Sequence, residues 1–233
     1  MNFNELKQDF WNKAYKRGGN ILFYPHEEIV RFINKYIRKR TGISEFQNIF
    51  PISDLEWKKF KSIDLGCGIG RHIKLLDEFQ LNPYGIDISN EAIEEGKRWM
   101  YSMNKEYLAD KMIVGSVTEL PYKDSFFDCG VSHSVLDCMP RNIAQQGFEE
   151  IIRVLKKNGM LYLDFYMDFN KGDVDEVVQE GFDKSTIKSY FTIESLKNFI
   201  GEKADIIELK IIRWTDESDI EHWRRAHVIL QKR

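Results

Sequence analysis

Between Lys61 and Tyr166 the chain alternates short apolar runs with amphipathic segments, and this alternation is the feature that most restricts its fold. Each run is rich in Ile, Val, Leu or Tyr, which is typical of a buried strand. Strands that alternate with helices form a parallel sheet covered on both faces. The predicted strands cover residues 61–66, 83–89, 112–117, 127–134 and 159–166, and the predicted helices cover residues 71–80, 90–104 and 142–157.

Two further segments flank this alternation. After a helix predicted over 192–203, two β-like runs at 204–216 and 221–233 are joined by so short a connection that they must pair antiparallel. Before it, helices are predicted over 4–16 and 26–40. The sequence therefore predicts an α/β fold with a mainly parallel, seven-stranded Rossmann-like sheet that ends in a C-terminal antiparallel hairpin. We expect residues 1–55 to form an N-terminal helical cap and residues 56–233 to form the main domain.

The charge balance indicates no polyanionic partner. There are 34 Lys and Arg against 37 Asp and Glu, a formal net charge of -3, so binding of nucleic acid is unsupported rather than excluded. The basic clusters lie at residues 37–40, 156–157 and 224–225, and we expect them to be solvated helix ends.

The cysteines and the apolar runs bear on the compartment. Cys67, Cys129 and Cys138 are odd in number and lack metal-ligand spacing. No apolar run approaches the roughly 18 residues of a membrane span, and the charged N-terminus has no signal-peptide core. We therefore expect a cytoplasmic protein with no membrane partner, and the sequence does not indicate an oligomeric state.

Three glycines stand at every second position in IDLGCGIGRH, residues 63–72. Glycine permits positive φ and close approach of a ligand to the backbone. The start of a helix presents amide groups and a positive dipole, so we expect bare amide hydrogens here that hold a small ligand with an anionic or polar group. The alternative is a tight turn without a ligand. The GxGxG spacing differs from the GxGxxG of dinucleotide-binding proteins, which disfavours a dehydrogenase.

Asp87 ends the second strand of the alternation, 17 residues after Gly70. A carboxylate at this position can accept hydrogen bonds from both hydroxyls of a ribose. It could also only cap the helix that starts at Asn90.

Four stretches, IDLGCGIGRH, YGIDIS, IVGSVTELPYKDSFFDCGVS and FEEIIRVLKKNGMLYLDF, follow one another over residues 60–166. In this order they resemble the motifs of small-molecule class I S-adenosylmethionine-dependent methyltransferases. The resemblance implies an S-adenosyl-L-methionine-binding methyltransferase domain over 56–233, with Asp87 on the ribose and Ile88 against the adenine. Many members have Gly-Asp where this chain has Gly115-Ser116, but a serine hydroxyl still accepts one hydrogen bond. The residues expected to bind the cofactor are Asp64, Gly66, Cys67, Gly68, Gly70, Arg71, Asp87, Ile88, Ser116, Val117, Ser132 and His133.

Methyl transfer requires an in-line approach of the acceptor and removal of its proton, by groups at the carboxyl ends of the strands. The fourth strand ends CGVSHSVLDCMP, so His133 is the first candidate for the general base. It could also contact the cofactor or acceptor, or be structural. Asp137 could orient the acceptor or cap the turn before Pro140.

Further residues are candidates for the acceptor site. Asp164 and Tyr166 end the fifth strand, and Tyr15, Tyr24 and His26 belong to aromatic N-terminal segments. In similar methyltransferases such a segment forms a lid over the cofactor, although simple packing on the sheet edge is the alternative. The sequence shows no acidic cluster at metal-ligand spacing, so no metal is expected.

These observations favour methylation of a small-molecule acceptor, at oxygen before nitrogen. Methylation of RNA and a non-catalytic cofactor-binding module are the alternatives.

Overall fold

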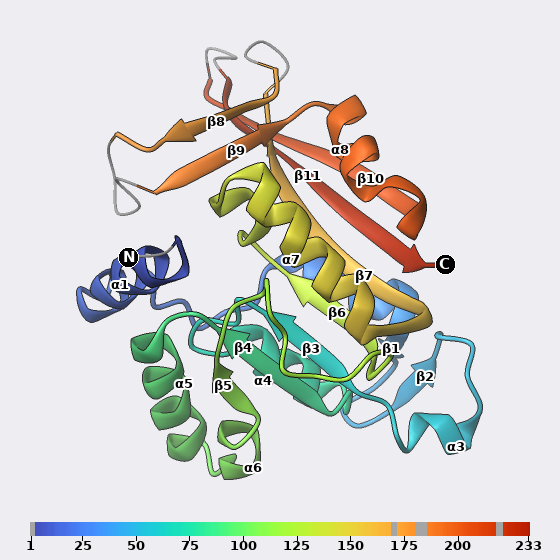
Figure 1. Ribbon diagram of the computed structural model, residues 1–233. Helices are drawn as coiled ribbons and strands as arrows, with labels where there is room; N and C mark the ends of the chain where they lie inside the picture. The colour runs from blue at the N-terminus through green and yellow to red at the C-terminus, as the bar shows by residue number, and fades with distance from the viewer. Residues whose placement is uncertain (1–2, 169–171, 180–185, 218–220) are drawn as a thin grey trace.

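A mixed β-sheet runs through the protein, which is described here from a computed structural model that covers residues 3–168, 172–179, 186–217 and 221–233 (Figure 1). Seven of its nine strands follow the order β10-β11-β7-β6-β3-β4-β5, and β9 and β8 are added beside β7. The strands of this sheet are β3 (Ser62–Leu65), β4 (Pro83–Asp87), β5 (Met112–Val114), β6 (Phe127–Ser132), β7 (Leu155–Met167), β8 (Val174–Val177), β9 (Ile187–Phe191), β10 (Ala204–Thr215) and β11 (Glu221–Lys232). A separate two-stranded sheet consists of β1 (Arg38–Arg40) and β2 (Phe46–Asn48).

Helices connect these strands and cover the sheet. The helices are α1 (Phe3–Lys16), α2 (Glu27–Phe32), α3 (Asp54–Trp57), α4 (Arg71–Glu78), α5 (Asn90–Ser102), α6 (Glu106–Ala109), α7 (Arg141–Val154) and α8 (Ile193–Ile200), with a π-helical turn at Ile33–Ile37 and 3₁₀ turns at Leu136–Cys138 and Gly201–Lys203. Among the helices in the described ranges, none is long and apolar enough to cross a membrane.

The predicted topology is confirmed. Strands β5, β4, β3, β6 and β7 are parallel, and β11 is antiparallel to both β7 and β10. The short connection between β10 and β11 includes residues 218–220, which lie outside the described residues. The sheet has two strands more than predicted, because β9 pairs with the end of β7 at Tyr166 and Met167, beyond the point where β6 ends.

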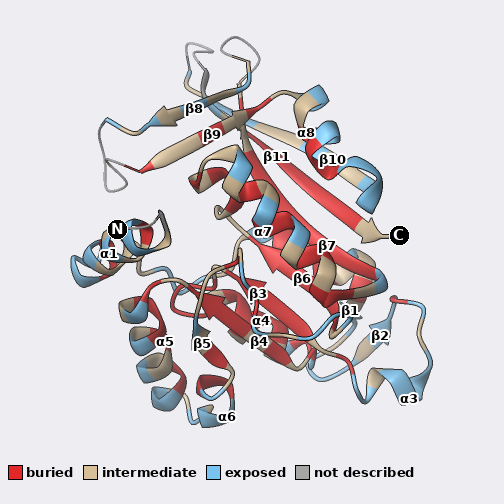
Figure 2. Cartoon of the chain, viewed as in Figure 1, coloured by how far each residue is buried: buried red, intermediate tan, exposed pale blue. Residues whose placement is uncertain are grey.

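Strand β7 shows why both faces of the sheet are covered. Leu161, Leu163 and Phe165 point to a buried cluster that includes residues of α7 and α8, whereas Met160 and Tyr162 point to a cluster that includes residues of α2 and α4. This alternation is the two-residue period of a strand. Figure 2 shows the result, with buried strands in the centre and helices that are buried only on their inner sides.

Two helices end earlier than predicted. The helix predicted over 26–40 ends as a π-helical turn at Ile37, because residues 38–40 extend and pair with β2. The helix predicted over 142–157 ends at Val154, because Leu155 is already extended and β7 begins there.

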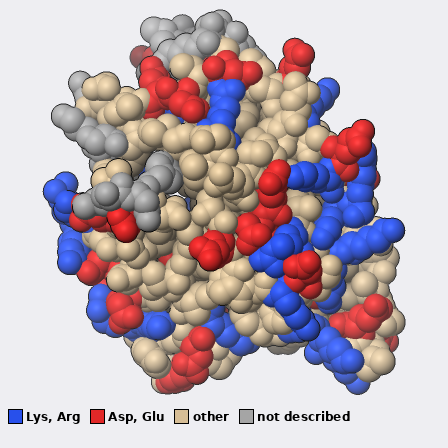
Figure 3. All heavy atoms as spheres, in the orientation of Figure 1, with Lys and Arg blue, Asp and Glu red and all other residues tan. Residues whose placement is uncertain are grey.

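The basic clusters are not solvated helix ends. Residues 38–40 and 156–157 lie in β1 and β7, and Arg225 lies in β11 with only 7% of its surface exposed. On the face shown in Figure 3, acidic side chains lie among the basic ones.

The N-terminal segment shares the core of the sheet. Ile29, Phe32 and Ile33 are fully buried in one cluster with Tyr162 of β7 and Ile229 of β11. The second predicted helix therefore packs on the sheet itself rather than forming a separate hydrophobic core.

A polar cluster on β10 holds the same segment. The Glu208 carboxylate accepts hydrogen bonds from Arg31, from Lys35 Nζ at 2.6 Å and from the Tyr36 hydroxyl at 2.6 Å. Hydrogen bonds from Arg31, against the opposing effect of burial, lower the pKa of Glu208 from its usual 4.5 to about 2. These bonds tie α2 and the π-helical turn to a strand about 170 residues further along the chain.

We predict that Glu208→Gln destabilises the protein by roughly 1 kcal/mol at neutral pH. A carboxylate with a lowered pKa stabilises the folded state above its unfolded pKa, and this contribution is lost as pH falls through the folded value. The stability difference between wild type and variant should therefore shrink between about pH 4.5 and pH 2. Urea unfolding across this range measures it, with Glu94→Gln on the exposed side of α5 as the control. An equal difference at pH 7 and pH 2.5 would contradict the assignment.

Candidate active site

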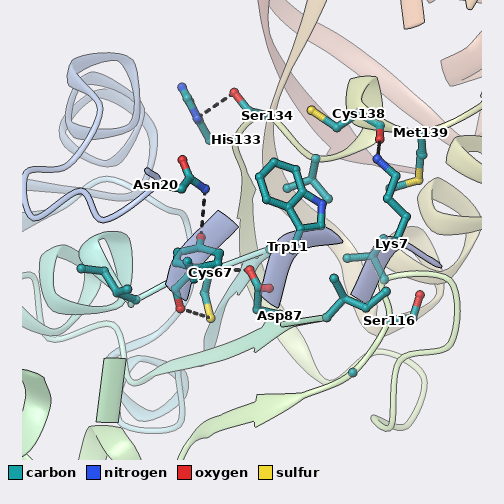
Figure 4. Close-up of a pocket in the computed structure, with 18 of the residues that line it drawn as sticks. Lys7, Trp11, Asn20, Cys67, Asp87, Ser116, His133, Ser134, Cys138 and Met139 are labelled. Atoms are coloured by element: carbon teal, nitrogen blue, oxygen red, sulfur yellow. Dashed lines mark hydrogen bonds between the residues drawn. The ribbon is translucent and has the colours of Figure 1, made fainter. Parts of the chain in front are cut away.

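A cavity of about 280 Å³ lies at the carboxyl ends of β3, β4 and β6 (Figure 4). In an open α/β sheet, ligands bind at this edge, where connections leave neighbouring strands in opposite directions. The lining comes from α1, from the turn after β3, from the ends of β4 and β5, and from the residues after β6. Its polar and aromatic members include Asn4, Lys7, Trp11, Tyr15, Asn20, Arg71, His72, Asp87, Ser116, Thr118, His133, Ser134 and Tyr166.

The glycine turn is folded back onto β4. The amides of Gly66 and Cys67 both donate to the Ile86 carbonyl, at 2.8 and 3.0 Å. The amide of Gly68 donates to Asp87 Oδ2 at 2.8 Å, and that of Gly70 donates to the Cys67 carbonyl at 2.9 Å. The prediction that these amide hydrogens are bare is therefore wrong, because the turn uses them to hold its own shape.

Instead, these glycines let other side chains of the protein lie close to the backbone of the turn. Gly66 and Gly68 have φ of 70° and 55°. A Cβ on Gly66 would lie 2.3 Å from Val135 Cγ2, and one on Gly68 would lie 2.5 Å from the Tyr15 hydroxyl oxygen. Only glycine fits under these two side chains.

Asp87 joins the turn to the next strand connection. Its Oδ1 accepts the Ser89 amide and its Oδ2 accepts the Gly68 amide, both at 2.8 Å. The N-cap of α5 is Ser89, whose hydroxyl accepts the Ala92 amide, so Asp87 does not cap this helix. Burial raises the pKa of Asp87 to about 6. The carboxylate also lines the cavity, where its remaining lone pairs can accept hydroxyl donors.

Asp64 is a buried carboxylate without a hydrogen-bond partner. It is fully buried at the end of β3, and among the described residues neither carboxylate oxygen has a partner. The Nδ1 atom of His72 lies 3.6 Å from Oδ1, which is longer than a hydrogen bond. A buried charge without donors is unfavourable unless a ligand supplies them.

Four histidines lie together beside the cavity, and two of them, His72 and His133, line it. The ring centroid of His133 lies 4.4 Å from that of His26 and 5.9 Å from that of His72, and His26 lies 5.4 Å from His227. Burial lowers the pKa of His133 to about 3, so its ring is neutral at pH 7 and one ring nitrogen carries a lone pair.

Behind His133 lies a buried ionic cluster that clamps three chain segments. Arg225 of β11 pairs with Asp164 of β7 (Nε to Oδ2, 2.8 Å) and with Asp137 after β6 (2.6 Å). The Tyr166 ring lies 4.2 Å from the guanidinium carbon. Burial raises the pKa of Asp137 to about 6 against the attraction of Arg225. Burial opposes ionisation of Asp164 as well, but Arg225, His133 and the Ser134 amide lower its pKa to about 2.

The structure brings most of the predicted site residues to one cavity. Those that line it are Tyr15, Gly66, Cys67, Gly68, Arg71, Asp87, Ile88, Ser116, Val117, His133 and Tyr166. Five further predicted residues are buried and do not line the cavity: Asp64, Gly70, Ser132, Asp137 and Asp164. The His26 ring packs against that of His133. Tyr24 is 85% exposed and does not line the cavity, and its carbonyl accepts a hydrogen bond from the lining residue Arg71 at 3.3 Å.

Several lining residues were not predicted. Asn4, Lys7 and Trp11 precede Tyr15 at intervals of three or four residues, so they form one stripe of α1 that faces the cavity. This spacing was visible in the sequence. Arg225 could not be found in the same way, because its carboxylate partners are 61 and 88 residues away.

We predict that Arg225→Met destabilises the protein by about 3 to 5 kcal/mol at pH 8, because it leaves two buried carboxylates without a counter-ion. Loss of the cation raises the folded-state pKa of both carboxyls, so the variant should regain stability relative to wild type as pH falls from 8 to 5. Chemical denaturation at several pH values measures this effect. Arg224→Met is the control and should cost less than about 1 kcal/mol. A small effect of Arg225→Met that does not vary with pH would show that the clamp is not needed.

Comparison with known proteins shows what part of this chain is similar to. Residues 63–163 match the family described as "Methyltransferase domain". A demethylmenaquinone methyltransferase of Staphylococcus aureus is 28% identical over 154 residues, which are 64% of this chain and 54% of that protein. A sterol 4-C-methyltransferase of Caenorhabditis elegans is 23% identical over 193 residues, which are 79% of this chain and 49% of that protein. This chain thus spans about half the length of these curated relatives.

The fold has counterparts among solved structures. The crystal structure of a SAM-dependent methyltransferase from Anabaena variabilis superposes with a TM-score of 0.64 at 14% identity, and the match covers 100% of this chain and 96% of that one. At this identity the likeness shows a shared fold.

Proposed function

We propose that this protein is a class I S-adenosylmethionine-dependent methyltransferase that transfers a methyl group from S-adenosyl-L-methionine to a small-molecule acceptor, at an oxygen atom, as the match of residues 63–163 to a methyltransferase domain supports. The observation that carries the proposal is the buried, unpartnered carboxylate of Asp64 beside the glycine turn. An amino-acid ammonium is a ligand that would supply the missing donors.

The residues of the cavity fit the cofactor. Asp64, which is buried next to the cavity rather than in its lining, would bind the amino group of the methionine part, and that part would lie along the turn that Gly66 and Gly68 shape. Asp87 would accept the ribose hydroxyls, and Ile88, Ser116 and Val117 would surround the adenine. When bound, the sulfonium supplies an electrophilic methyl group with a neutral leaving thioether. The part of the protein is to bind and align the reactants and to accept a proton.

Arg71 would offset the carboxylate of the methionine part. Its guanidinium lines the cavity at the first turn of α4 and donates to the Tyr24 carbonyl at 3.3 Å. Within the described ranges no carboxylate oxygen lies within ion-pair distance of it, so a ligand anion would be its direct counter-ion.

His133 would accept the proton of the acceptor hydroxyl. It lines the cavity beside Ser134 and is uncharged at neutral pH. Tyr166 and His26 would contact the acceptor or support that contact. The relatives named above act on a sterol and on demethylmenaquinone by name, which supports a small organic acceptor. The choice of oxygen as the methylated atom rests on His133 as the proton acceptor. It does not rest on the relatives, since the name of the sterol enzyme gives carbon as its acceptor atom.

We also propose that residues 1–55 act as a cap in which α1 closes the cofactor cavity. Asn12 Oδ1 accepts the Ser89 hydroxyl at 2.8 Å, and Gln8 donates to the Ile88 carbonyl at 3.0 Å. These bonds hold Trp11 and Tyr15 over the cavity. A cytoplasmic location is part of the proposal, and the three free cysteines support it.

The first test is binding of S-adenosylhomocysteine by calorimetry to wild type and to Asp64→Asn. The variant should bind at least about tenfold more weakly, because it loses the charge that pairs with the amino group. It should also be more stable than wild type without ligand by roughly 1 kcal/mol, because a buried unpaired charge has been removed.

Asp128→Asn is the matched control for this test. Asp128 is also buried, but its oxygens accept the Lys61 amide at 2.9 Å and pair with Lys156 at 2.6 Å, away from the cavity. This change should lower stability and leave affinity unaltered. Wild-type protein that binds no S-adenosylhomocysteine would refute the proposed function. Transfer from methyl-labelled cofactor to metabolite fractions, followed by NMR of the labelled product, would identify the acceptor atom as oxygen, nitrogen or carbon.

A further inference from the structure

We propose that the ring of His133 is held with its proton on Nε2, so that Nδ1 is the atom that takes the acceptor proton, and that Asp164 is the positioning residue that fixes this tautomer. The role of Nδ1 in methyl transfer rests on the proposed function. The tautomer itself is a property of the protein alone and can be measured without an acceptor.

The Nδ1 side of the ring faces groups that can donate hydrogen bonds. Arg71 NH2 lies 3.4 Å from Nδ1 and the Ser134 hydroxyl oxygen lies 3.1 Å from it. A guanidinium can only donate. A proton on Nδ1 could donate to the Ser134 hydroxyl but would point at an Arg71 proton, whereas a lone pair there can accept from both groups. Since Arg71 and Ser134 line the cavity, this lone pair lies at the cavity wall (Figure 4).

The Nε2 side of the ring faces a group that can only accept. Asp164 Oδ2 lies 3.5 Å from Nε2, and this carboxyl is ionised at neutral pH because its pKa is lowered to about 2. The separation is longer than a hydrogen bond, as is common in ligand-free sites, where such contacts tighten on binding. An ionised carboxylate favours a proton on the nitrogen that faces it. Both sides of the ring thus select the same tautomer.

Asp164 is itself held in place by one hydrogen bond and one ion pair. Its Oδ1 accepts the Ser134 amide at 2.7 Å, and its Oδ2 lies 2.8 Å from Arg225 Nε. The carboxylate is only 2% exposed and does not line the cavity. It therefore reaches the acceptor only through His133, which makes it a positioning residue.

The neighbouring histidines provide a built-in comparison. The backbone amide of His26 donates to His72 Nε2 at 3.3 Å, so His72 carries its proton on Nδ1, the atom 3.6 Å from Asp64 Oδ1. The Nδ1 atom of His26 accepts the Glu28 amide at 3.2 Å, so His26 carries its proton on Nε2. The same reasoning therefore predicts opposite tautomers for His72 and His133.

The proton-transfer step follows from this arrangement. The acceptor hydroxyl would replace the Ser134 or Arg71 contact at Nδ1. Its O–H bond then breaks, the electron pair stays on oxygen, and the proton forms an N–H bond at Nδ1. The resulting imidazolium has Asp164 as its counter-ion on the opposite side of the ring.

The test is a long-range ¹H–¹⁵N correlation spectrum of the imidazole rings in uniformly labelled full-length protein at pH 7.5, assigned with His133→Gln and His72→Gln. We expect His133 as the Nε2–H tautomer and His72 as the Nδ1–H tautomer in the same spectrum. A His133 ring with its proton on Nδ1 would overturn the proposal.

Asp164→Asn tests the positioning role. An asparagine cannot accept from the Ser134 amide, Arg225 and His133 together, because one of its two terminal atoms is a donor. The preference of His133 for the Nε2–H form should fall by roughly tenfold or more, while His72 keeps its tautomer. Asp128→Asn should leave the signals of both rings unchanged. An Asp164→Asn protein that folds and retains the wild-type His133 tautomer would show that Asp164 is only structural.

Kinetics separate this inference from the proposed function. If wild type binds S-adenosylhomocysteine and methylates an acceptor, Asp164→Asn should retain that binding within about twofold and lose about 10²-fold or more in kcat. Wild type that transfers no methyl group would end the proposed function and leave the tautomer assignment intact. Full activity in an Asp164→Asn protein with an altered tautomer would instead disprove the role of Nδ1.

Discussion

The ion cluster of Arg225 is the constraint on which the catalytic wall depends. One guanidinium joins β11, the end of β7 and the turn after β6 through Asp164 and Asp137. These are the segments that carry Tyr166, Ser134 and His133 into the cavity. Burying three charges is favourable only if each is paired with good geometry. The sheet already pairs β11 with β7 at these residues, and the cluster adds the turn after β6 to that pair.

The same cluster gives its two carboxyl groups different properties. Asp137 receives one backbone amide, from Tyr166, and one Arg225 nitrogen, and burial leaves its pKa high. Asp164 also faces His133, and its pKa is low. Environment rather than residue type thus decides at which pH each acid loses its charge. Sequence reasoning assigned both residues to the acceptor site, whereas neither lines the cavity.

Local patterns predicted the strands along the chain, their mainly parallel sheet and the C-terminal hairpin, because period-two and helical spacing are properties of neighbouring residues. They did not predict β8 and β9, whose place depends on the free edge of β7 beyond β6. Nor did they show that the amides of the glycine turn are already hydrogen-bonded. The acceptors of the Gly66, Cys67 and Gly68 amides belong to a different strand, β4, and only the folded sheet brings that strand alongside.

Two histidines line the cavity, and they differ in whether the ring nitrogen with the lone pair is open to a ligand. His72 and His133 each lie beside a buried aspartate, but the His26 amide already occupies the acceptor nitrogen of His72. A backbone amide held at the start of α2 cannot rotate away. The contacts at His133 Nδ1 come from side chains, a serine hydroxyl and an arginine, which can both give way to a ligand. Among the described residues that line the cavity, His133 is thus the histidine whose lone pair an acceptor can reach.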